Sequence, residues 1–262
     1  MQTLSLGKHN PKLTELRNAI RRSELTAAGL LPIEGPKLLE EAVRSGLEVM
    51  DVFIRRGVGL NVSLSNSNVY EVEDAIFKTV QSTETSQGII ALVRPPAFSL
   101  GGILSVANPL IVVLARLQDP GNVGTILRVA ESFGATGCIA LPGTAGAHNS
   151  KTVRASAGSV FRLPHVWNVG LHDLVPALDA AGVKLAGTSP AARQPIDAWD
   201  WSQPGAVLVG NEGSGLSDEE TAACDTVLRI PQNPAVESLN SAIATAVILY
   251  EASKHERTPV RK

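Results

Sequence analysis

Residues 208–216 read LVGNEGSGL, with glycine at positions 210, 213 and 215. Glycines at this density let backbone amides and carbonyls reach a ligand directly, because no side chain intervenes. The stretch follows a predicted strand at 206–209, where ligands gather in open α/β sheets. It lacks the Gly-Lys-Ser/Thr of a Walker loop, and its GxxGxG spacing after a late strand differs from a Rossmann fingerprint. The sequence therefore predicts a ligand-binding loop, and a simple cluster of turn glycines is the alternative.

The second half of the chain alternates strand and helix around this loop. Residues 110–115 form a continuous apolar run, which is typical of a strand buried on both faces. Such alternation predicts an α/β fold with a parallel sheet and helices on both sides. The other predicted strands lie at 137–141, 183–188, 206–209 and 227–230, and the predicted helices lie at 123–133 and 238–255.

The first half reads as a separate, small α/β unit. Its predicted helices lie at 11–23 and 37–45, and its predicted strands at 29–35, 49–54, 69–72 and 88–93. Two prolines at 95–96 and the stretch Ser-Leu-Gly-Gly at 99–102 indicate a boundary. We therefore expect one domain at 1–98 and a second at 107–262.

Charge is distributed unevenly along the chain. The 262 residues carry a formal net charge of −2, with 44% hydrophobic and 18% charged residues, which suits packed cores and is not basic overall. Basic residues nevertheless gather in the first 25 positions, at Lys8, Lys12, Arg17, Arg21 and Arg22. Arg17 and Arg21 share one helical face and are candidates for RNA contact. An ordinary solvated helix face is the alternative.

Composition also indicates the cellular compartment in which the protein is expected. No run of about eighteen uncharged apolar residues is present, so we expect no membrane span. The start of the chain lacks the apolar core of a signal peptide. Cys138 and Cys224 show no metal-ligand spacing and are expected to be buried small hydrophobes in a reducing compartment. These features predict a cytoplasmic protein without a metal site.

Residues 119–128, DPGNVGTILR, follow the first strand of the second half. Pro-Gly favours a tight turn, and Asn122 is suited to cap the helix that follows. Gly124 and Arg128 lie four residues apart and hence on one face, which would leave the approach to Arg128 open. An arginine there can bind a phosphate or carboxylate with two hydrogen bonds. An ordinary capped helix with a surface arginine is the alternative.

Residues 230–242, IPQNPAVESLNSA, follow the last predicted strand. The loop is stiffened by proline and leads into the final helix, which is expected to begin near Ser238. Ser238, Asn240 and Ser241 gather polar groups at that helix N-terminus, where an anionic group is stabilised. Capping explains one of these residues but hardly all three.

Together, NxGxxxR, GNEGxGL and IP…ESLNSAIA resemble the three ordered motifs of the SpoU branch of the SPOUT superfamily, over about residues 107–255. Residues 33–35 and 83–88 also resemble the small RNA-binding domain that often precedes SpoU catalytic domains. The resemblance implies a C-terminal SPOUT domain with a parallel sheet and a deep trefoil knot, an exception to the rule against knots. It also implies S-adenosyl-L-methionine (SAM) as the methyl donor and a ribose 2′-hydroxyl as the acceptor.

The resemblance assigns roles to particular residues. Residues that should contact SAM are Thr188, Gly210, Ile230 and Leu239. Residues that should form the catalytic surface are Asn122, Arg128, Glu212, Ser238 and Asn240. The stretch 149–158 also resembles the family, and its Lys151 and Arg154 are expected to meet RNA phosphate.

The resemblance also guides the expected partners. We expect RNA as substrate, ribosomal rather than transfer RNA. The final helix is apolar almost all round from 242 to 250, which indicates more than one buried face. SPOUT proteins usually dimerise through this region, so a homodimer through the catalytic domain is expected. A helix enclosed within its own domain is the alternative.

The three motifs contain no histidine or cysteine, so they offer no conventional base. The family assigns that role to Arg128, although a guanidinium stays protonated. We instead interpret Arg128 as binding the adjacent phosphate and stabilising the developing alkoxide, with the proton passing to a substrate phosphate or water. Glu212 is expected to hold Arg128 or Asn122 in place. Three other functions stay open: a non-catalytic RNA-binding protein with this fold, a Rossmann-type nucleotide enzyme, and a base methyltransferase.

Overall fold

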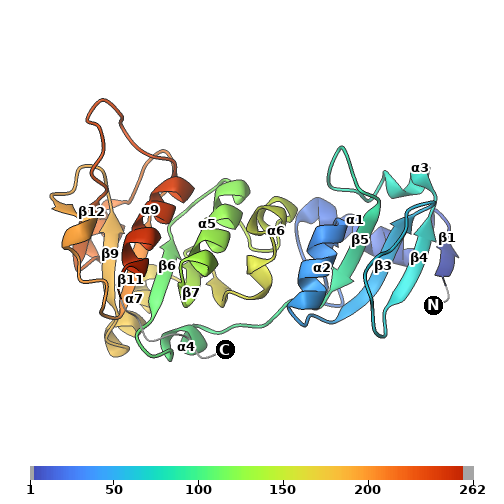
Figure 1. The fold of residues 1–262 in the computed structure, drawn as a ribbon, viewed down its shortest axis with the longest axis horizontal. Coiled ribbons are helices and arrows are strands. Elements are labelled where there is room, and N and C mark those ends of the chain that lie inside the picture. The colour runs from blue at the N-terminus through green and yellow to red at the C-terminus, as the bar shows by residue number, and fades with distance from the viewer. Residues whose placement is uncertain (1–2, 256–262) are drawn as a thin grey trace. The chain divides into compact units, whose positions relative to one another are not determined.

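A computed structural model of the chain describes residues 3–255 and divides into two units (Figure 1). Unit 1 comprises Met1–Ala97 together with His148–Arg162. Unit 2 comprises Phe98–Ala147 together with Leu163–Lys262. The predicted division into two α/β units is therefore present, but one segment of the second half belongs by its contacts to the first unit.

Unit 1 is built on a five-stranded mixed sheet in the order β1-β4-β3-β5-β2. Strands β1, β4 and β3 are parallel to one another, and β5 runs antiparallel to both β3 and β2. The strands are β1 (Thr3–Leu6), β2 (Leu31–Glu34), β3 (Val49–Arg55), β4 (Asn68–Val72) and β5 (Ile89–Val93). The helices are α1 (Pro11–Arg22), α2 (Pro36–Arg44), α3 (Asp74–Phe77), α6 (Ser150–Ser156) and the 3-10 turn η1 (Ser159–Phe161).

Helix α1 shows how local sequence produces this unit. The side chain of Asn10 accepts a hydrogen bond from the Lys12 amide, and Pro11 occupies the first turn, where its missing N–H costs nothing. Leu13 and Leu16 lie three residues apart and are completely buried in the core with Phe53, Tyr70 and Phe77. The helix thus turns its apolar face to the sheet and its basic face to solvent.

Helix α6 corrects the expected domain boundary, which assigned residues 107–262 to one domain. The helix contacts β2 of unit 1, and its Thr152, Val153 and Ser156 are buried. The position of α6 depends on packing between residues more than a hundred positions apart in the sequence. Sequence order therefore does not reveal it.

Unit 2 contains a seven-stranded, all-parallel sheet in the order β10-β12-β9-β11-β6-β7-β8. The strands are β6 (Leu110–Leu114), β7 (Gly137–Ala140), β8 (His165–Trp167), β9 (Lys184–Thr188), β10 (Gln194–Pro195), β11 (Gly205–Val209) and β12 (Thr226–Arg229). The helices are α4 (Leu100–Leu104), α5 (Pro120–Ser132), α7 (Leu171–Ala180), α8 (Asp218–Ala222), α9 (Ser241–Ser253) and the 3-10 turn η2 (Ile196–Ala198).

The centre of this sheet carries the core of unit 2. Every residue of β6 and of β11 is buried, as expected for parallel strands covered on both faces. Helices α5 and α9 pack against each other, so segments far apart in the sequence lie side by side (Figure 1). Among residues 3–255, no helix is long and apolar enough to cross a membrane.

The predicted strands and long helices are all present, with small shifts at their ends. Helix α5 begins at Pro120 rather than 123, and α9 begins at Ser241 rather than 238. Several shorter elements escaped prediction, among them β1, β8 and α7. Strand β8 is three residues long and only half-buried, and α7 contains Pro176, which obscures its helical pattern.

Candidate active site

A cavity of about 570 Å³ lies where β9, β11 and β12 end. All four residues predicted to contact SAM line this cavity, namely Thr188, Gly210, Ile230 and Leu239. Glu212 and Ser238, which were predicted on the catalytic surface, line it as well. The location agrees with the rule that ligands bind at the carboxyl ends of parallel strands.

The loop from Gly210 to Leu216 forms one wall of the cavity and folds back on itself. The backbones of Asn211 and Gly215 exchange two hydrogen bonds of 3.1 and 3.0 Å, and Gly215 adopts a left-handed φ of 65°. A Cβ on Gly210 would lie 2.5 Å from the Gly215 carbonyl carbon. The loop's own backbone therefore requires glycine at position 210, independently of any ligand.

Asn122, Glu212 and Asn240 come from three separate motifs and meet here. The Asn122 Nδ2 donates to Glu212 Oε1 at 3.2 Å, and the Asn240 Nδ2 donates to Asn122 Oδ1 at 3.1 Å. Sequence had suggested Asn122 as a helix cap, but Asp119 caps α5 by accepting from the Gly121 amide. Pro120 at the first helical position shifts the cap to Asp119 and leaves the Asn122 side chain for this network.

Glu212 is the acceptor at the centre of the network. Its carboxylate also accepts from the backbone amides of Gln118 and Asp119, each at 3.3 Å. Burial opposes ionisation, but these hydrogen bonds and the one from Asn122 outweigh it, so the pKa of Glu212 lies below its usual range. The carboxylate thus holds Asn122, and not Arg128, in place.

Asn240 has two tasks at the start of α9. Its Oδ1 accepts from the amides of Ala242 and Ile243, which makes it the N-cap of the helix. The same amide group donates through Nδ2 to Asn122. Ser238 lies in the preceding loop, is exposed and lines the cavity.

Arg128 lies on α5 with its side chain exposed, and within residues 3–255 it has no ion-pair or side-chain hydrogen-bond partner. Gly124, which was expected to leave an open approach beside it, is buried. The two residues lie one turn apart on α5, but Gly124 is covered whereas the Arg128 side chain stays at the surface. The free guanidinium is available to an anionic ligand.

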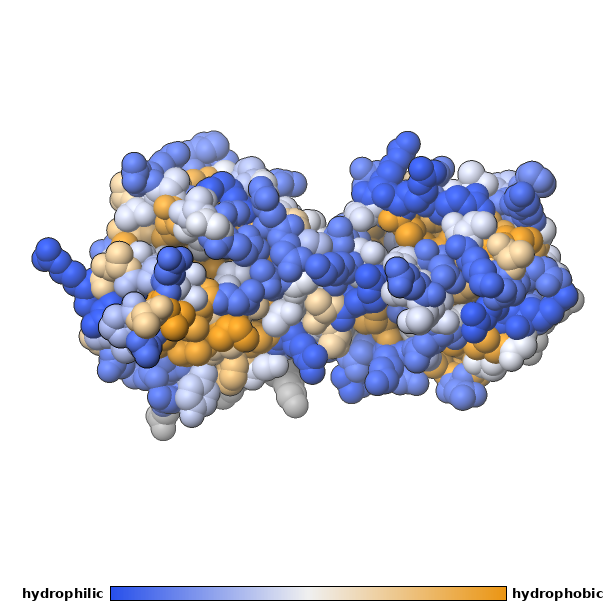
Figure 2. Space-filling model, turned by 90° about the horizontal axis from the view of Figure 1, so that it is seen from above, coloured by the Kyte–Doolittle hydropathy of each residue, from blue (hydrophilic) through white to orange (hydrophobic). Residues whose placement is uncertain are grey.

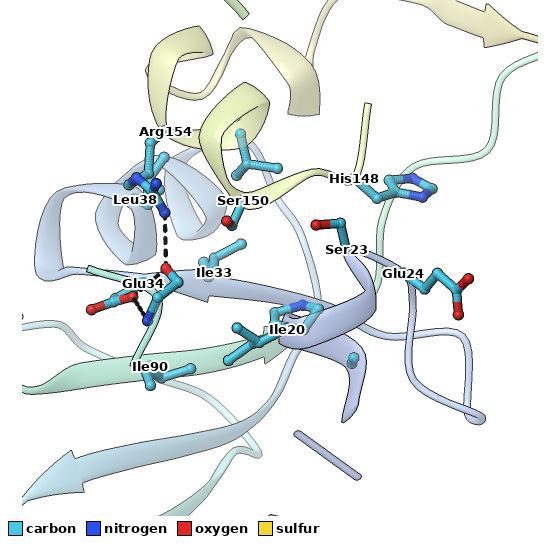
Figure 3. A pocket seen from close by; sticks show the side chains of 14 residues that line it. Ile20, Ser23, Glu24, Ile33, Glu34, Leu38, Ile90, His148, Ser150 and Arg154 are labelled. Carbon is cyan, nitrogen blue, oxygen red and sulfur yellow. Dashed lines mark hydrogen bonds between the residues drawn. The ribbon is translucent and has the colours of Figure 1, made fainter. Parts of the chain in front are cut away.

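The residues predicted to bind RNA phosphate in unit 1 differ in exposure. Arg21 and Lys151 are exposed, and Arg17 is half-buried. The Arg17 guanidinium donates to Thr79 Oγ1 at 3.0 Å. Arg154 is half-buried and donates to Ser82 Oγ at 2.8 Å (Figure 3). The structure therefore gives Arg154 an internal partner that sequence did not suggest.

Ser82 is also bound by Glu34, the last residue of β2 (Figure 3). The Glu34 carboxylate accepts from the Ser82 amide at 2.7 Å, from Ser82 Oγ at 2.5 Å and from Thr83 Oγ1 at 2.7 Å. Burial would raise the pKa of Glu34, but these bonds lower it below its usual range. The enclosed space beside them is only about 10 Å³, too small for a ligand.

Two residues near the cavity escaped sequence analysis. Arg116 lies two positions beyond β6 and forms two hydrogen bonds with Glu220, Nε–Oε1 at 2.9 Å and Nη2–Oε2 at 2.7 Å. Ser217 caps α8, and Glu220 completes a capping box with it. The sequence offered a signal only for Glu220, three residues after the Ser217 cap.

The cysteines are not placed for chemistry. Cys138 is completely buried, and burial raises the pKa of its thiol. Cys224 is half-buried, and burial, then Asp225 and Glu220, raise the pKa of its thiol to about 11. In the part of the chain that the structure describes, no three His, Cys, Asp or Glu side chains converge as a metal site would need.

The chain is similar in sequence to known RNA methyltransferases. Residues 109–250 match the SpoU rRNA Methylase family, and residues 10–91 match the MRM3-like substrate binding domain. The chain is 33% identical to the Bacillus subtilis 23S rRNA (guanosine(2553)-2′-O)-methyltransferase RlmP, over 92% of this chain and 95% of that protein. It is 32% identical to the Streptomyces viridochromogenes 23S rRNA (uridine(2479)-2′-O)-methyltransferase, over 88% and 85% of the two chains.

A solved structure supports the same assignment. The SpoU methyltransferase AviRb from Streptomyces viridochromogenes, in complex with the cofactor AdoMet, superimposes with a TM-score of 0.82 and 29% identity, covering 94% of this chain and 98% of that chain. The family match and the relatives confirm the predicted RNA ribose 2′-O-methyltransferase activity with SAM as cofactor. This chain belongs to the SpoU rRNA methylase family.

Proposed function

We propose that this enzyme transfers the methyl group of SAM to a ribose 2′-hydroxyl of ribosomal RNA. The observation that carries the proposal is the network of Asn122, Glu212 and Asn240, which joins three motifs beside one cavity. Ribosomal rather than transfer RNA is favoured because relatives that align with most of the chain are named as 23S rRNA methyltransferases.

The cavity suits SAM in size and chemistry. Small-molecule sites are mostly apolar pockets of about 300–1,000 Å³ with a few polar groups, and this cavity of about 570 Å³ falls in that range. Its lining combines apolar Leu216, Leu239 and Ile248 with the backbone of the glycine-rich loop. The Ser241 hydroxyl in the lining is buried and has no hydrogen-bond partner among the described residues, so the wall retains unused polar capacity.

We assign SAM contact to Thr188, Gly210, Ile230 and Leu239, which all line the cavity. Bound SAM supplies an activated methyl group. The protein then needs to hold the ribose hydroxyl in line with that group, and such positioning supplies much of the rate. Ser238 and the network of Asn122, Glu212 and Asn240 would form the surface that orients the ribose.

Arg128 would bind the phosphate beside the target nucleotide and stabilise the alkoxide as the hydroxyl loses its proton. Its guanidinium is exposed and has no side-chain partner among residues 3–255, which supports this role, because a fork of N–H donors suits a phosphate. The guanidinium stays protonated, so the proton would pass to a substrate phosphate or to water. Glu212 stays ionised and orients Asn122 instead of acting as the base.

We propose that unit 1, which includes the segment 148–162, selects the RNA and that unit 2 carries the transfer. Arg17, Arg21 and Lys151 are assigned to RNA phosphate. Arg154 is the least available of the four predicted residues, because Ser82 already holds it. The free cysteines and the RNA substrate favour a cytoplasmic enzyme.

A homodimer through unit 2 is part of the proposal. Helix α9 exposes Ile243, Val247 and Tyr250, which lie four and three residues apart and form one apolar stripe. Ile243 and Tyr250 are each 54% exposed, which is unusual for large apolar side chains on a single helix face. Figure 2 shows hydrophobic surface gathered into a patch on unit 2. A second copy of this chain would cover the stripe.

The trefoil knot is proposed for the segment between β12 and α9. Strand β12 lies next to β9, beyond β11 and β6, whereas α9 packs on α5, the helix that follows β6. The chain therefore returns across the sheet before it ends, and this path supports a threaded C-terminus.

The identity of the group that accepts the methyl group is tested with an RNA of known sequence. Ribose methylation is first mapped by mass spectrometry in ribosomal RNA from cells with and without the gene, and a short RNA carrying the mapped site is then synthesised. We expect methylation of this RNA and none when the target nucleotide is 2′-deoxy, with binding only modestly weaker. A 2′-deoxy nucleotide one position away is the matched control. Methyl transfer to the deoxy target would mean that a base is the acceptor.

A further inference from the structure

Arg116 lies behind the glycine-rich wall of the cavity and touches it at several points. Its Nη2 donates to the Gly215 carbonyl at 3.1 Å, and its Nη1 donates to Ser214 Oγ at 3.4 Å. Its own carbonyl accepts from Asn211 Nδ2 at 2.8 Å. One residue thus contacts both strands of the small hairpin that Asn211 and Gly215 close.

The guanidinium is itself held rigidly by Glu220. The Arg116 side chain is partly exposed to solvent, which weakens the ion pair, but the Glu220 side chain is only 7% exposed. Hydrogen bonding to Glu220 raises the pKa of Arg116, and the same bond lowers the pKa of Glu220. Glu220 also accepts from the Ser217 amide at 2.7 Å, so α8 anchors the pair.

The backbone of Arg116 is unusual for an arginine. It adopts a left-handed φ of 59°, a conformation that costs free energy for residues with a Cβ. Its amide donates to Thr144 Oγ1 at 3.1 Å, which holds this conformation. Contacts with Thr144, with Glu220 and with the loop at Asn211, Ser214 and Gly215 compensate for the strained backbone.

The two ends of the loop are supported differently. Glu212 receives its hydrogen bonds from Gln118, Asp119 and Asn122, so the catalytic end does not depend on Arg116. Residues 213–216, which line the cavity, are supported at Ser214 and Gly215 by Arg116. Loss of the Arg116 side chain should therefore affect the cofactor wall more than the catalytic surface.

We propose that Arg116 is a positioning residue for cofactor binding, which holds residues 213–216 in the shape that SAM requires without touching SAM itself. This inference rests on the proposed cofactor site. Two parts of one loop then have separate functions. Residues 213–216, held in place by Arg116, bind the cofactor, and Glu212 orients the ribose by holding Asn122.

The test measures SAM binding to the full-length chain by calorimetry. Arg116→Asn removes the guanidinium but keeps a residue that tolerates a left-handed φ, so the loop's path is preserved. We expect SAM to bind this variant about tenfold more weakly, as for the loss of a hydrogen bond to a charged group, with unchanged stoichiometry. Arg116→Lys keeps the charge but loses the two-point geometry, so its affinity for SAM should lie between those of the wild type and Arg116→Asn.

A second variant tests the same pair from the other side. Glu220→Gln keeps the capping box with Ser217 but removes the charge that holds Arg116. Its effect on the SAM dissociation constant should not add to that of Arg116→Asn, because both changes break one connection. Lys184→Ala is the matched control, because it breaks a different ion pair of unit 2. Lys184 Nζ lies 2.8 Å from Asp225 Oδ1, at the end of β9 that faces away from the cavity.

The outcomes are distinguishable. A positioning role raises the dissociation constant and the KM for SAM, while kcat at saturating SAM stays within a few-fold of the wild type. A merely structural role lowers the stoichiometry and kcat and leaves the dissociation constant unchanged, which would overturn the inference. Unchanged binding in a folded Arg116→Asn would overturn it as well. Failure of the wild-type chain to bind SAM would instead count against the proposed cofactor site.

Discussion

Two regions of the molecule each contain a carboxylate that accepts three hydrogen bonds, but the spaces beside the two carboxylates differ greatly in size. In unit 2, the Glu212 carboxylate accepts three hydrogen bonds from the start of α5 and the residues before it, and the cavity beside it measures about 570 Å³. In unit 1, the Glu34 carboxylate accepts three hydrogen bonds from residues 82 and 83, and the space beside it measures about 10 Å³. Both carboxylates have a lowered pKa.

The difference lies in what surrounds each carboxylate. Helix α6 packs on β2 and brings Arg154 onto Ser82, so this arginine is engaged. On α5, Arg128 is exposed and has no side-chain partner among residues 3–255. A carboxylate network with a lowered pKa therefore does not identify a ligand site by itself. The two networks differ in the cavity that one of them borders and in Arg128, which has no side-chain partner among residues 3–255.

The largest expected effect separates the two arginines. Arg128→Ala should lower kcat by about 100-fold to 1,000-fold, because it removes the charge that stabilises the developing alkoxide. Arg128→Lys should be nearly as damaging, since lysine loses the fork that binds phosphate. Both should bind SAM normally in calorimetry. Methyl transfer under single-turnover conditions measures the effect.

Arg154→Ala is the comparison for Arg128. Its kcat should stay close to the wild type, because Arg154 donates to Ser82 and lies in unit 1. A loss as large as that of Arg128→Ala would show that the unit 1 network serves the chemistry. Near-normal turnover by Arg128→Ala would remove that residue from the mechanism.

The next effect concerns the glycine-rich loop. Gly210→Ala should lower the free energy of unfolding by about 1–3 kcal/mol, because its Cβ would lie 2.5 Å from the Gly215 carbonyl carbon. Gly213→Ala is the matched control, since its Cβ would meet only Asn211 Oδ1 at 3.7 Å. Denaturant unfolding measures both. Equal stability of the two variants would contradict the folded-back loop.

Asn240 allows its two tasks to be separated. Asn240→Ala should lose the cap of α9 and about 1 kcal/mol of stability, together with the bond to Asn122. Asn240→Ser keeps a good N-cap but provides no Nδ2 donor, so it should stay stable and still lose activity. Thermal unfolding and methyl transfer are measured on both. Full activity of Asn240→Ser would remove the Asn122 contact from the site.

The smallest expected effect depends on pH in unit 1. Because the pKa of Glu34 is lowered by folding, its stabilisation is complete above the ordinary pKa of a glutamate and is lost as the pH falls through the lowered value. Glu34→Gln should cost about 1 kcal/mol at pH 7, after allowance for solvent screening, and progressively less in acid. Unfolding at several pH values measures this difference. A constant difference down to pH 3 would contradict the assignment.

Sequence predicted the site better than it predicted the local reasons for it. Asn122, Glu212 and Asn240 were expected on one surface, and the structure brings them within hydrogen-bond distance. The reasons differ, however, because the cap of α5 is Asp119 and Gly124 is buried. Caps and buried faces depend on shifts of one to three residues at helix ends, which sequence patterns do not resolve.

The sequence by itself determined the two α/β halves, the order of the three motifs and the family. Apolar runs such as 110–115 and loop glycines such as Gly210 are local signals, readable without knowledge of their neighbours. Tertiary packing alone places α6 in unit 1, binds Arg154 to Ser82 and sets Arg116 against Gly215, while Arg128 has no side-chain partner among residues 3–255. These features depend on contacts between residues about 70 to 125 positions apart, such as Arg154 with Ser82 and Asn149 with Ser23. Packing of folded elements sets such contacts, and no local pattern encodes them.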